Sequence, residues 1–197
     1  MVDTLKQFRA PLLIVISAPS GAGKTTLCGR LLDDFQELRL SISTTTRAPR
    51  GQEQHGREYF FTSRDEFESQ IAQDHFVEWA NVHGNYYGTS KKVIEESLTA
   101  GQSVLLDIDV QGAESLKKTF SERCVSIFIA PPSMEELENR LRSRGTDPES
   151  SIQRRLQNAR QEMAQASRFD YQLINDNLEL TYRRLWEIVG KALGRLN

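Results

Sequence analysis

The sequence predicts an α/β fold in which helices cover both faces of a parallel β-sheet. Short apolar runs such as Leu12–Ile16, Val104–Asp109 and Val125–Ala130 are typical of central strands that are buried on both sides. Segments with the apolar spacing of helices separate these runs, and such alternation indicates parallel strands. The chain has 197 residues, of which 38% are hydrophobic and 26% charged, as expected for one globular domain.

Composition and charge narrow the classes of function. The formal net charge of −2 gives no reason to expect broad binding to nucleic-acid phosphates. Cys28 and Cys124 lie far apart in apolar surroundings, which favours buried free thiols in a reducing compartment. Residues 1–10 lack the apolar core of a signal peptide, and no apolar run reaches the length of a membrane span. We therefore expect a cytoplasmic protein without nucleic-acid or membrane partners, and the sequence does not indicate its oligomeric state.

The segment after the first apolar run has the residues of a phosphate-binding loop, or P-loop. It reads Ala18-Pro19-Ser20-Gly21-Ala22-Gly23-Lys24-Thr25 and continues with Thr26. In such a loop, backbone N–H groups surround phosphate oxygens, and glycines leave out the Cβ atoms that would block their approach. Lys24 would reach the β- and γ-phosphates of a bound nucleotide, and the Thr25 hydroxyl would hold Mg²⁺.

Ala18 departs from this motif, which has glycine at its first position. The alternative interpretation is an ordinary glycine-rich loop between a strand and a helix. The preceding apolar run, the following helical pattern and the Lys24-Thr25 pair together favour the P-loop.

Between the P-loop and residue 90 the sequence predicts mostly short elements. Leu38, Leu40 and Ile42 alternate with polar residues, which indicates a strand with one covered face. Ser63 and Glu66 form a capping box for a short helix, and Phe76–Val82 has the composition of a strand. Residues 84–88 contain two glycines and an asparagine and predict a turn. We interpret this region as a small β-rich insertion.

Helix signals return in the second half of the chain. One helix is expected to begin near Ser90 and to end at Gly101, and another to be capped by Ser133 with Glu136. A third is expected to have Asp147 as N-cap and Pro148 in its first position. Residues 171–174 predict a last strand, and residues 178–193 predict a terminal helix.

Charged residues at predicted strand ends and loops are further candidates for function. Asp107 ends an apolar strand as the Mg²⁺-binding aspartate of P-loop proteins does, although a loop-capping aspartate is the alternative. Arg47 and Arg50 could grip one phosphate with two guanidiniums, or they could belong to a solvated basic turn. A second basic group spans two predicted helices, where some members must be solvated and others could close over a phosphoryl group: Arg140, Arg142, Arg144, Arg154, Arg155 and Arg160.

Several of these runs, with their spacing, resemble the guanylate kinase family. The resemblance extends from about Leu13 to the terminal helix, and its most specific part lies between residues 45 and 62. The matching residues are Thr45-Thr46-Arg47, Arg50, Glu53, Gly56, Tyr59, Phe61-Thr62, Gly84-Asn85-Tyr86-Tyr87-Gly88-Thr89, Leu106-Asp107-Ile108-Asp109, Gln111-Gly112 and Arg144-Gly145-Thr146.

The resemblance implies a P-loop nucleoside-monophosphate kinase that converts ATP and GMP into ADP and GDP with Mg²⁺. It implies a core (residues 1–42, 91–132 and 168–197), a GMP-binding region (43–90) and a helical lid (133–167). Ser43, Arg47, Arg50, Tyr59 and Tyr87 would hold the GMP phosphate. Glu78 and Thr89, with Gly88 beside them, would read the guanine, and Asp109 would support that pocket. The transferring phosphate would be contacted by Lys24, Arg50, Arg140, Arg144 and Arg155. The metal would be held by Thr25 and Asp107. Asn175 would lie near the adenine.

Chemistry supports the assignment of Glu78. A carboxylate accepts hydrogen bonds from guanine N1–H and the 2-amino group together, whereas adenine offers neither donor, so a buried Glu78 would lose its partners. Two other functions are open to this fold. A guanylate-kinase-like scaffold that binds peptides would lack a working P-loop, and a kinase with another phosphorylated acceptor would lack the guanine-reading pair.

Overall fold

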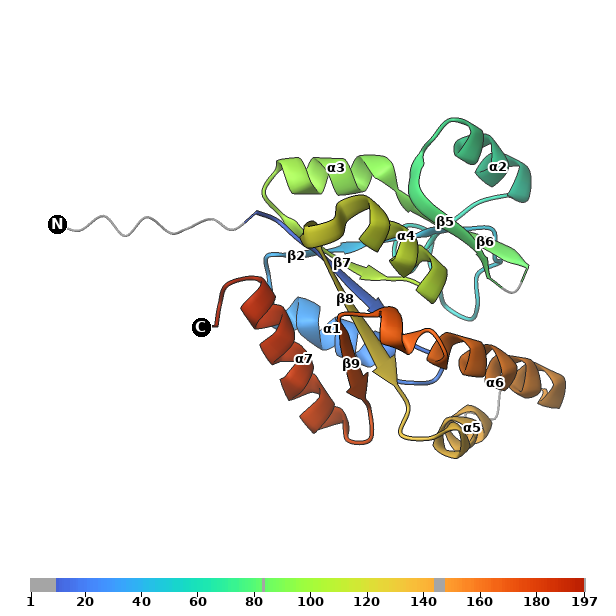
Figure 1. Ribbon diagram of the computed structural model, residues 1–197. Coiled ribbons are helices and arrows are strands. Elements are labelled where there is room, and N and C mark those ends of the chain that lie inside the picture. The colour runs from blue at the N-terminus through green and yellow to red at the C-terminus, as the bar shows by residue number, and fades with distance from the viewer. Residues whose placement is uncertain (1–9, 83, 144–147, 197) are drawn as a thin grey trace.

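A computed structural model describes residues 10–82, 84–143 and 148–196. Its centre is a five-stranded sheet in the order β2-β7-β1-β8-β9, and every neighbouring pair is parallel (Figure 1). The strands are β1 (Leu13–Ser17), β2 (Leu38–Ser41), β7 (Ser103–Asp107), β8 (Cys124–Ala130) and β9 (Tyr171–Ile174). The predicted α/β class and its three central strands are confirmed.

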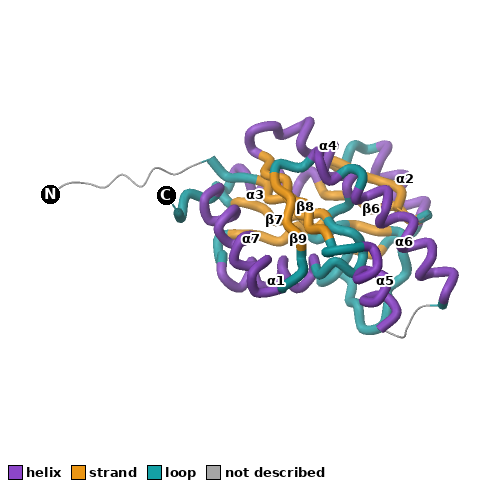
Figure 2. Tube along the Cα trace, turned by 60° about the horizontal axis from the view of Figure 1, so that its bottom comes forward, coloured by secondary structure: helices purple, strands orange, loops and turns teal. Residues whose placement is uncertain are grey.

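Alternating side chains of the strands build a hydrophobic core on each face of this sheet. Leu13 and Val15 of β1 pack toward α3 (Lys91–Thr99) and α4 (Val110–Phe120). Ile14 and Ile16 pack on the other face, toward α1 (Lys24–Asp34) and α7 (Leu178–Ala192). Figure 2 shows the sheet between these helices. This double burial explains why the central strands are apolar at consecutive positions.

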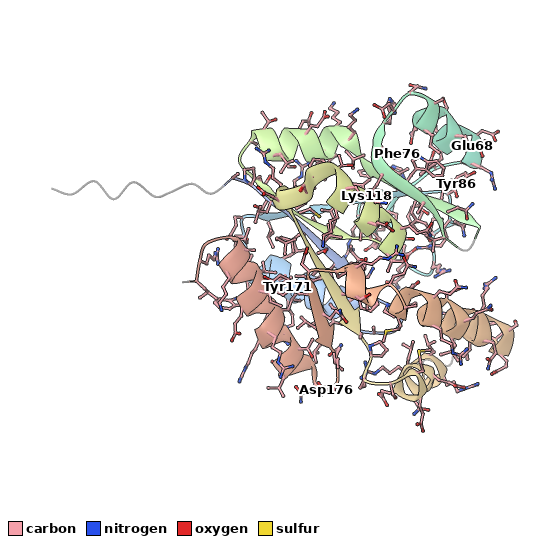
Figure 3. The ribbon with its side chains drawn as sticks, viewed as in Figure 1. Glu68, Phe76, Tyr86, Lys118, Tyr171 and Asp176 are labelled. Carbon is pink, nitrogen blue, oxygen red and sulfur yellow. The ribbon has the colours of Figure 1, made fainter. Side chains whose placement is uncertain are left out.

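The region after β2 forms a second sheet, in the order β4-β3-β6-β5. It contains β3 (Thr44–Thr45), β4 (Phe60–Phe61), β5 (Phe76–Val82), β6 (Asn85–Ser90) and the helix α2 (Arg64–Ala72). Its core is aromatic, because the Phe67 ring stacks on Phe76 and on Tyr86 with centroid distances of 4.5 and 5.3 Å. Figure 3 shows Phe76 and Tyr86 on this part of the molecule, beside Glu68 of α2. The β-rich region therefore has packing of its own.

Two further helices, α5 (Met134–Ser143) and α6 (Glu149–Met163), follow β8 and precede β9 in the chain. They pack on each other through an apolar cluster that includes Leu137, Leu141, Ile152 and Leu156. Short 3₁₀ turns precede β8 (Ser121–Arg123) and β9 (Ala166–Arg168). None of the described helices is both long and apolar enough to cross a membrane.

The local helix signals are confirmed. The Ser63 hydroxyl accepts from the Glu66 N–H at 3.1 Å, Ser90 caps α3, and Ser133 accepts from the Glu136 N–H at 3.0 Å. Cys28 and Cys124 are free and buried, as expected. The prediction for α6 was wrong by one position, since Pro148 is its N-cap and not its first helical residue. Asp147 lies outside the described residues.

Three other expectations need correction. Residues 85–88 belong to strand β6 and not to a turn, because Asn85–Ser90 pairs antiparallel with β5. Of the predicted turn, Gly84 lies outside the strand and has a φ of +87°. In β2, Leu38 is buried but Leu40 is 36% exposed, since β2 is an edge strand of the main sheet. Helix α4 was not predicted, although Asp109 caps it by accepting from the Gly112 N–H at 2.9 Å.

Candidate functional site

A cleft of about 430 Å³ lies where the carboxyl ends of β1 and β7 meet the second sheet and α6. Ligands of open α/β sheets bind at this edge. The P-loop forms one part of the wall, β5, β6 and the β3–β4 loop another, and α6 the third. Its lining includes most of the expected site residues: Ala18, Pro19, Ser20, Gly21, Gly23, Lys24, Thr25, Thr26, Ser43, Arg50, Tyr59, Glu78, Tyr87, Asp107, Asp109 and Arg155.

The P-loop has the backbone that the sequence predicts. Gly21 and Gly23 have φ angles of +100° and +95°, a region that side chains other than glycine rarely adopt. The Ala22 N–H donates to the Pro19 carbonyl at 3.0 Å, and α1 starts at Lys24, so the helix N-terminus borders the cleft. Such a helix start adds partial positive charge to the phosphate-binding backbone.

Asn175 lies against the back of this loop. Its side-chain amide donates to the Ala22 carbonyl at 2.7 Å, and a Cβ built on Gly23 would come within 2.4 Å of the same nitrogen. The Asn175 side chain is buried, and its backbone carbonyl accepts from Arg140 at 3.1 Å. Asn175 supports the P-loop in this way, and its expected place near the adenine stays a prediction. Arg140 is bound to Asn175 and to Glu136.

Lys24 and Asp107 form an ion pair at the bottom of the cleft. Burial alone would lower the pKa of Lys24, but the charge of Asp107 and its hydrogen bond outweigh this and raise the pKa above its ordinary value. Lys24 is therefore fully charged at neutral pH. The oxygens of Thr25 and Asp107 both line the cleft, and they are the hard donors that Mg²⁺ prefers.

The opposite end of the cleft contains a buried carboxylate, that of Glu78 on β5. The Thr89 hydroxyl of β6 donates to its Oε1, because residues 78 and 89 pair across the two strands. Burial, with the charge of Asp109, raises the pKa of Glu78 to about 7, although the hydrogen bond from Thr89 acts against this. The Glu78 carboxylate can still accept hydrogen bonds from donors on an incoming ligand.

Gly112 provides the space that Glu78 occupies. A Cβ at position 112 would lie 2.5 Å from Glu78 Oε2, closer than any van der Waals contact. The glycine of the Gln111-Gly112 pair therefore lets the first turn of α4 approach the carboxylate. Gly88 has a different role, because a Cβ there would come within 2.8 Å of the Phe76 ring. It serves the packing of the aromatic core.

If this pocket binds GMP, as the resemblance implies, Gly112→Ala should raise the KM for GMP about tenfold, because the added methyl group must displace the Glu78 carboxylate. Steady-state kinetics at varied GMP and fixed ATP would measure this. Gly29→Ala is a matched control, since it also lies within a helix but a Cβ there meets nothing within 4 Å. An unchanged KM in Gly112→Ala would contradict the placement of Glu78.

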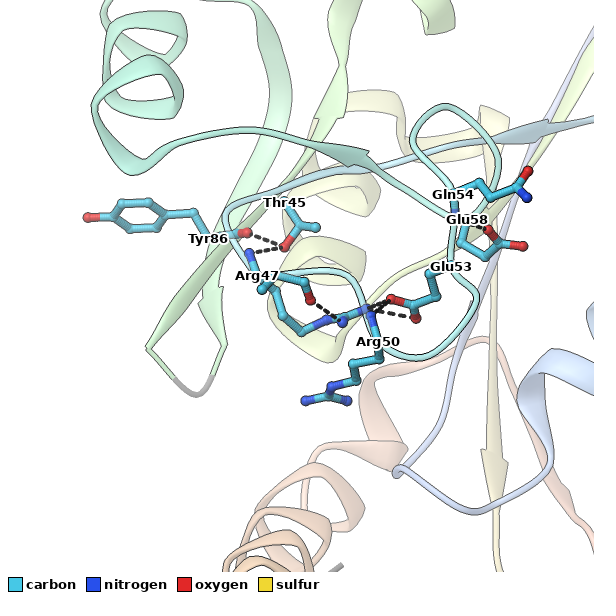
Figure 4. Close-up of polar contacts among 8 residues, drawn as sticks. Thr45, Arg47, Arg50, Glu53, Gln54, Glu58 and Tyr86 are labelled. Carbon is cyan, nitrogen blue, oxygen red and sulfur yellow. Dashed lines mark hydrogen bonds and ion pairs between the residues drawn. The ribbon is translucent and has the colours of Figure 1, made fainter. Parts of the chain in front are cut away.

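Side chains near the β3–β4 loop form the region where a phosphate was expected. Ser43, Arg50, Tyr59 and Tyr87 line the cleft there, and the Arg50 side chain points away from Glu53 (Figure 4). Arg47 lies behind them and is only 8% exposed. Its Nη2 donates to both oxygens of Glu53 at 2.9 Å. The structure thus brings Arg50 to the cleft and holds Arg47 behind the Tyr59 ring.

Helix α6 provides the remaining wall of the cleft. Arg155 Nη2 donates to the Ser20 hydroxyl at 2.5 Å, so this arginine touches the P-loop as expected of a lid residue. Arg142 pairs with Glu138 and Glu149 on an exposed face, which matches the expectation that some of these arginines are solvated. Arg144 lies outside the described residues.

The sequence did not indicate some residues of this wall. Glu162 of α6 lines the cleft, and burial raises its pKa to about 7 against the effect of Lys24. Ser151 and Asn158 also face the cleft. Polar residues on an amphipathic helix give no local signal of function, and only the packing of α6 against the cleft identifies them.

Comparison with known proteins agrees with this geometry. The sequence model of the family described as guanylate kinase matches residues 10–192. The guanylate kinase of Dechloromonas aromatica is 54% identical over 166 residues, which cover 84% of this chain and 82% of that protein. That of Oleidesulfovibrio alaskensis is 50% identical over 177 residues, covering 90% and 85%. The crystal structure of guanylate kinase from Anaplasma phagocytophilum is 35% identical in sequence and superposes with a TM-score of 0.76. The match covers 92% of this chain and 86% of that chain. The chain therefore belongs to the guanylate kinase family.

Proposed function

We propose that ATP binds at the P-loop end of the cleft and GMP at the end formed by the second sheet. The protein is a guanylate kinase, which transfers the γ-phosphoryl group of ATP to GMP, gives ADP and GDP, and contributes to purine nucleotide metabolism. The observation that supports this arrangement best is that one cleft is lined by the P-loop and by the buried carboxylate of Glu78.

At the ATP end, the backbone N–H groups of residues 20–26 surround the phosphates and Lys24 neutralises charge on the β- and γ-phosphates. Thr25 and Asp107 would hold Mg²⁺, which when bound supplies positive charge to the phosphate oxygens. Asp107 pairs with Lys24 in this structure, so the carboxylate that would hold the metal and the ammonium that would face the phosphates lie side by side. Asn175 keeps the loop in place through the Ala22 carbonyl.

At the GMP end, Ser43, Arg50, Tyr59 and Tyr87 bind the phosphate, with Arg47 behind them. Glu78 accepts hydrogen bonds from guanine N1–H and the 2-amino group. Thr89 orients that carboxylate by donating to Oε1, and Asp109 borders the same pocket. Because adenine has an acceptor at N1 and lacks the 2-amino group, it would leave Glu78 buried without partners.

In the reaction, an oxygen of the GMP phosphate attacks the γ-phosphorus, and the bond from that phosphorus to the β–γ bridging oxygen breaks. That oxygen leaves with ADP and keeps the electron pair. The GMP phosphate is already anionic at neutral pH, so catalysis depends on alignment and charge stabilisation more than on a general base. Lys24, Arg50 and the lid arginines Arg140, Arg144 and Arg155 supply that charge as the lid closes and excludes water.

We also propose the three functional regions of the chain that the family resemblance implies. Residues 1–42, 91–132 and 168–197 form the core, 43–90 bind GMP, and 133–167 form the lid. The second sheet with its own aromatic packing and the separate α5–α6 cluster support this division. The net charge of −2 gives no reason to expect nucleic-acid partners, and the free cysteines Cys28 and Cys124 support a reducing compartment such as the cytoplasm.

The selectivity for guanine has a direct test. Assays with ATP and each of GMP, AMP, CMP and UMP, coupled to ADP formation, should show a kcat/KM for GMP higher than for AMP by about 10³-fold or more. Equal rates with GMP and AMP would contradict the role of Glu78. Measuring ADP formation without any acceptor corrects for hydrolysis of ATP.

A further inference from the structure

Glu53, in the loop between β3 and β4, connects the two arginines of the phosphate region. Its Oε1 and Oε2 each accept from Arg47 Nη2 at 2.9 Å, and Oε2 also accepts from the backbone N–H of Arg50 at 2.8 Å. The Glu53 N–H donates in return to the Arg50 carbonyl at 3.0 Å. Figure 4 shows this carboxylate between the Arg47 side chain and the Arg50 backbone.

Arg47 is held on every side by protein groups. Its Nη1 donates to the Ala48 carbonyl at 2.8 Å, and its backbone N–H donates to the Thr45 hydroxyl at 3.2 Å. Its guanidinium carbon lies 5.2 Å from the centre of the Tyr59 ring, which lines the cleft. The Arg47 side chain is buried and charged, so it needs a counter-charge, and Glu53 supplies it.

The carboxyl of Glu53 is charged at neutral pH. Its burial acts to raise the pKa, but hydrogen bonds from the Arg50 N–H and from Arg47 hold the pKa below its ordinary value. The pair with Arg47 is therefore a charged one, and losing it would leave a buried cation without compensation.

We propose that Glu53 is a positioning residue for the GMP phosphate. It holds the Arg47 guanidinium against the back of Tyr59 and closes the turn from which Arg50 reaches the cleft. This inference rests on the proposed function, since it takes Arg50 and Tyr59 to be the phosphate-binding groups. Glu53 itself acts through these residues and does not touch the reacting atoms.

The geometry explains why such a residue is needed. Two guanidiniums near one phosphate site repel each other before the phosphate arrives, and a carboxylate that pairs with Arg47 reduces this repulsion. The same carboxylate fixes the backbone at residue 50. Preorganised groups bind a phosphate more tightly, because less conformational entropy is lost on binding.

The test is Glu53→Gln, which keeps the shape of the side chain but removes its charge and sets an amide donor against the donors of Arg47. We expect the kcat/KM for GMP to fall about 10- to 100-fold, while the KM for ATP changes by less than about twofold. Glu58→Gln is the matched control, because Glu58 accepts from the Gln54 N–H in the same loop and pairs with Arg57. It should leave both values unchanged.

A double-mutant cycle with Arg47→Ala separates positioning from a general effect on folding. If Glu53 acts through Arg47, most of the loss caused by Glu53→Gln disappears in the Arg47→Ala background. Full additivity, or an equal rise in the KM values for GMP and ATP, would overturn the inference. If Glu53→Gln does not fold, as judged by circular dichroism, Glu53→Asp undergoes the same cycle; its shorter carboxylate cannot reach both partners, and the same outcomes decide.

Variants of the two arginines distinguish a failure of the proposed phosphate site from a failure of the role of Glu53. If Arg47→Ala and Arg50→Ala both leave the kinetics with GMP unchanged, the phosphate site of the proposed function fails. If they raise the KM for GMP and Glu53→Gln does not, only the role of Glu53 fails.

Discussion

Replacing Lys24 by alanine is expected to lower kcat by about 10³-fold or more, with the fold intact. Lys24 is the cation of the P-loop, and in the proposed function its ammonium neutralises charge on the transferring phosphate. The fold does not depend on it, because the cores on both faces of the sheet are formed by other residues. An assay coupled to ADP formation measures kcat, and circular dichroism checks folding.

Lys92→Ala is the control for this experiment. Lys92 is a highly exposed lysine at the start of α3, where its side chain is 82% exposed and pairs with Glu96. Such surface pairs contribute little, so both kcat and stability should remain as in the wild type. A Lys24→Ala variant that kept its kcat within about tenfold of the wild type would contradict the P-loop assignment.

Glu78→Gln is expected to lower the kcat/KM for GMP by about 10³-fold, because a primary amide has one acceptor where the carboxylate has two and turns a donor toward the guanine. The KM for ATP should stay the same, since the proposed ATP site is at the other end of the cleft. Thr89→Val, which removes the hydroxyl that orients the carboxylate, should cause a smaller loss in the same direction. Equal losses for GMP and ATP would argue for a damaged fold and against base reading.

Glu78→Gln should also stabilise the protein above neutral pH. The folded-state pKa of Glu78, about 7, exceeds the ordinary value of 4.5, so the folded protein binds the extra proton between these values. Stability therefore falls as the pH rises through this window, by about 3 kcal/mol in total. Glu78→Gln escapes this loss, and its melting temperature at about pH 8 should be higher than that of the wild type.

The pH dependence of GMP binding follows from this pKa. Guanine donors need the carboxylate form, so the affinity for GMP should fall about fivefold from pH 7 to pH 6 through Glu78 alone. The GMP phosphate also titrates near pH 6. In Glu78→Gln only the titration of the GMP phosphate remains. Comparing the pH dependence of its GMP affinity with that of the wild type therefore isolates the contribution of Glu78.

Features set by local chemistry could be predicted from the sequence. The P-loop depends on glycines at fixed positions, and Gly21 and Gly23 have the positive φ angles that this requires. Serine caps before helices, as at Ser63 and Ser133, depend on residues three positions apart. Apolar strands such as β1 follow from burial on both faces. Each of these signals lies within a few residues of the structure that it specifies.

Features set by distant contacts could not be predicted. The first part of strand β6 has the composition of a turn, and its pairing with β5 and β3 makes it a strand. Asn175 meets the Ala22 carbonyl 153 positions away in the chain. The pairing of Arg47 with Glu53 depends on the path of the β3–β4 loop, so the spacing of Arg47 and Arg50 indicated a shared ligand but not that Arg47 would lie behind the cleft wall. Glu162 reaches the cleft through the packing of α6.

A crystal structure of the protein with GMP and a non-hydrolysable ATP analogue tests the central claim most directly. We expect the GMP phosphate to contact Arg50 and Tyr59, and guanine N1 and the 2-amino group to donate to the Glu78 carboxylate. The analogue should lie on the P-loop with its γ-phosphate directed at GMP. A guanine bound away from Glu78, with its phosphate out of reach of Arg50, would contradict the proposed site.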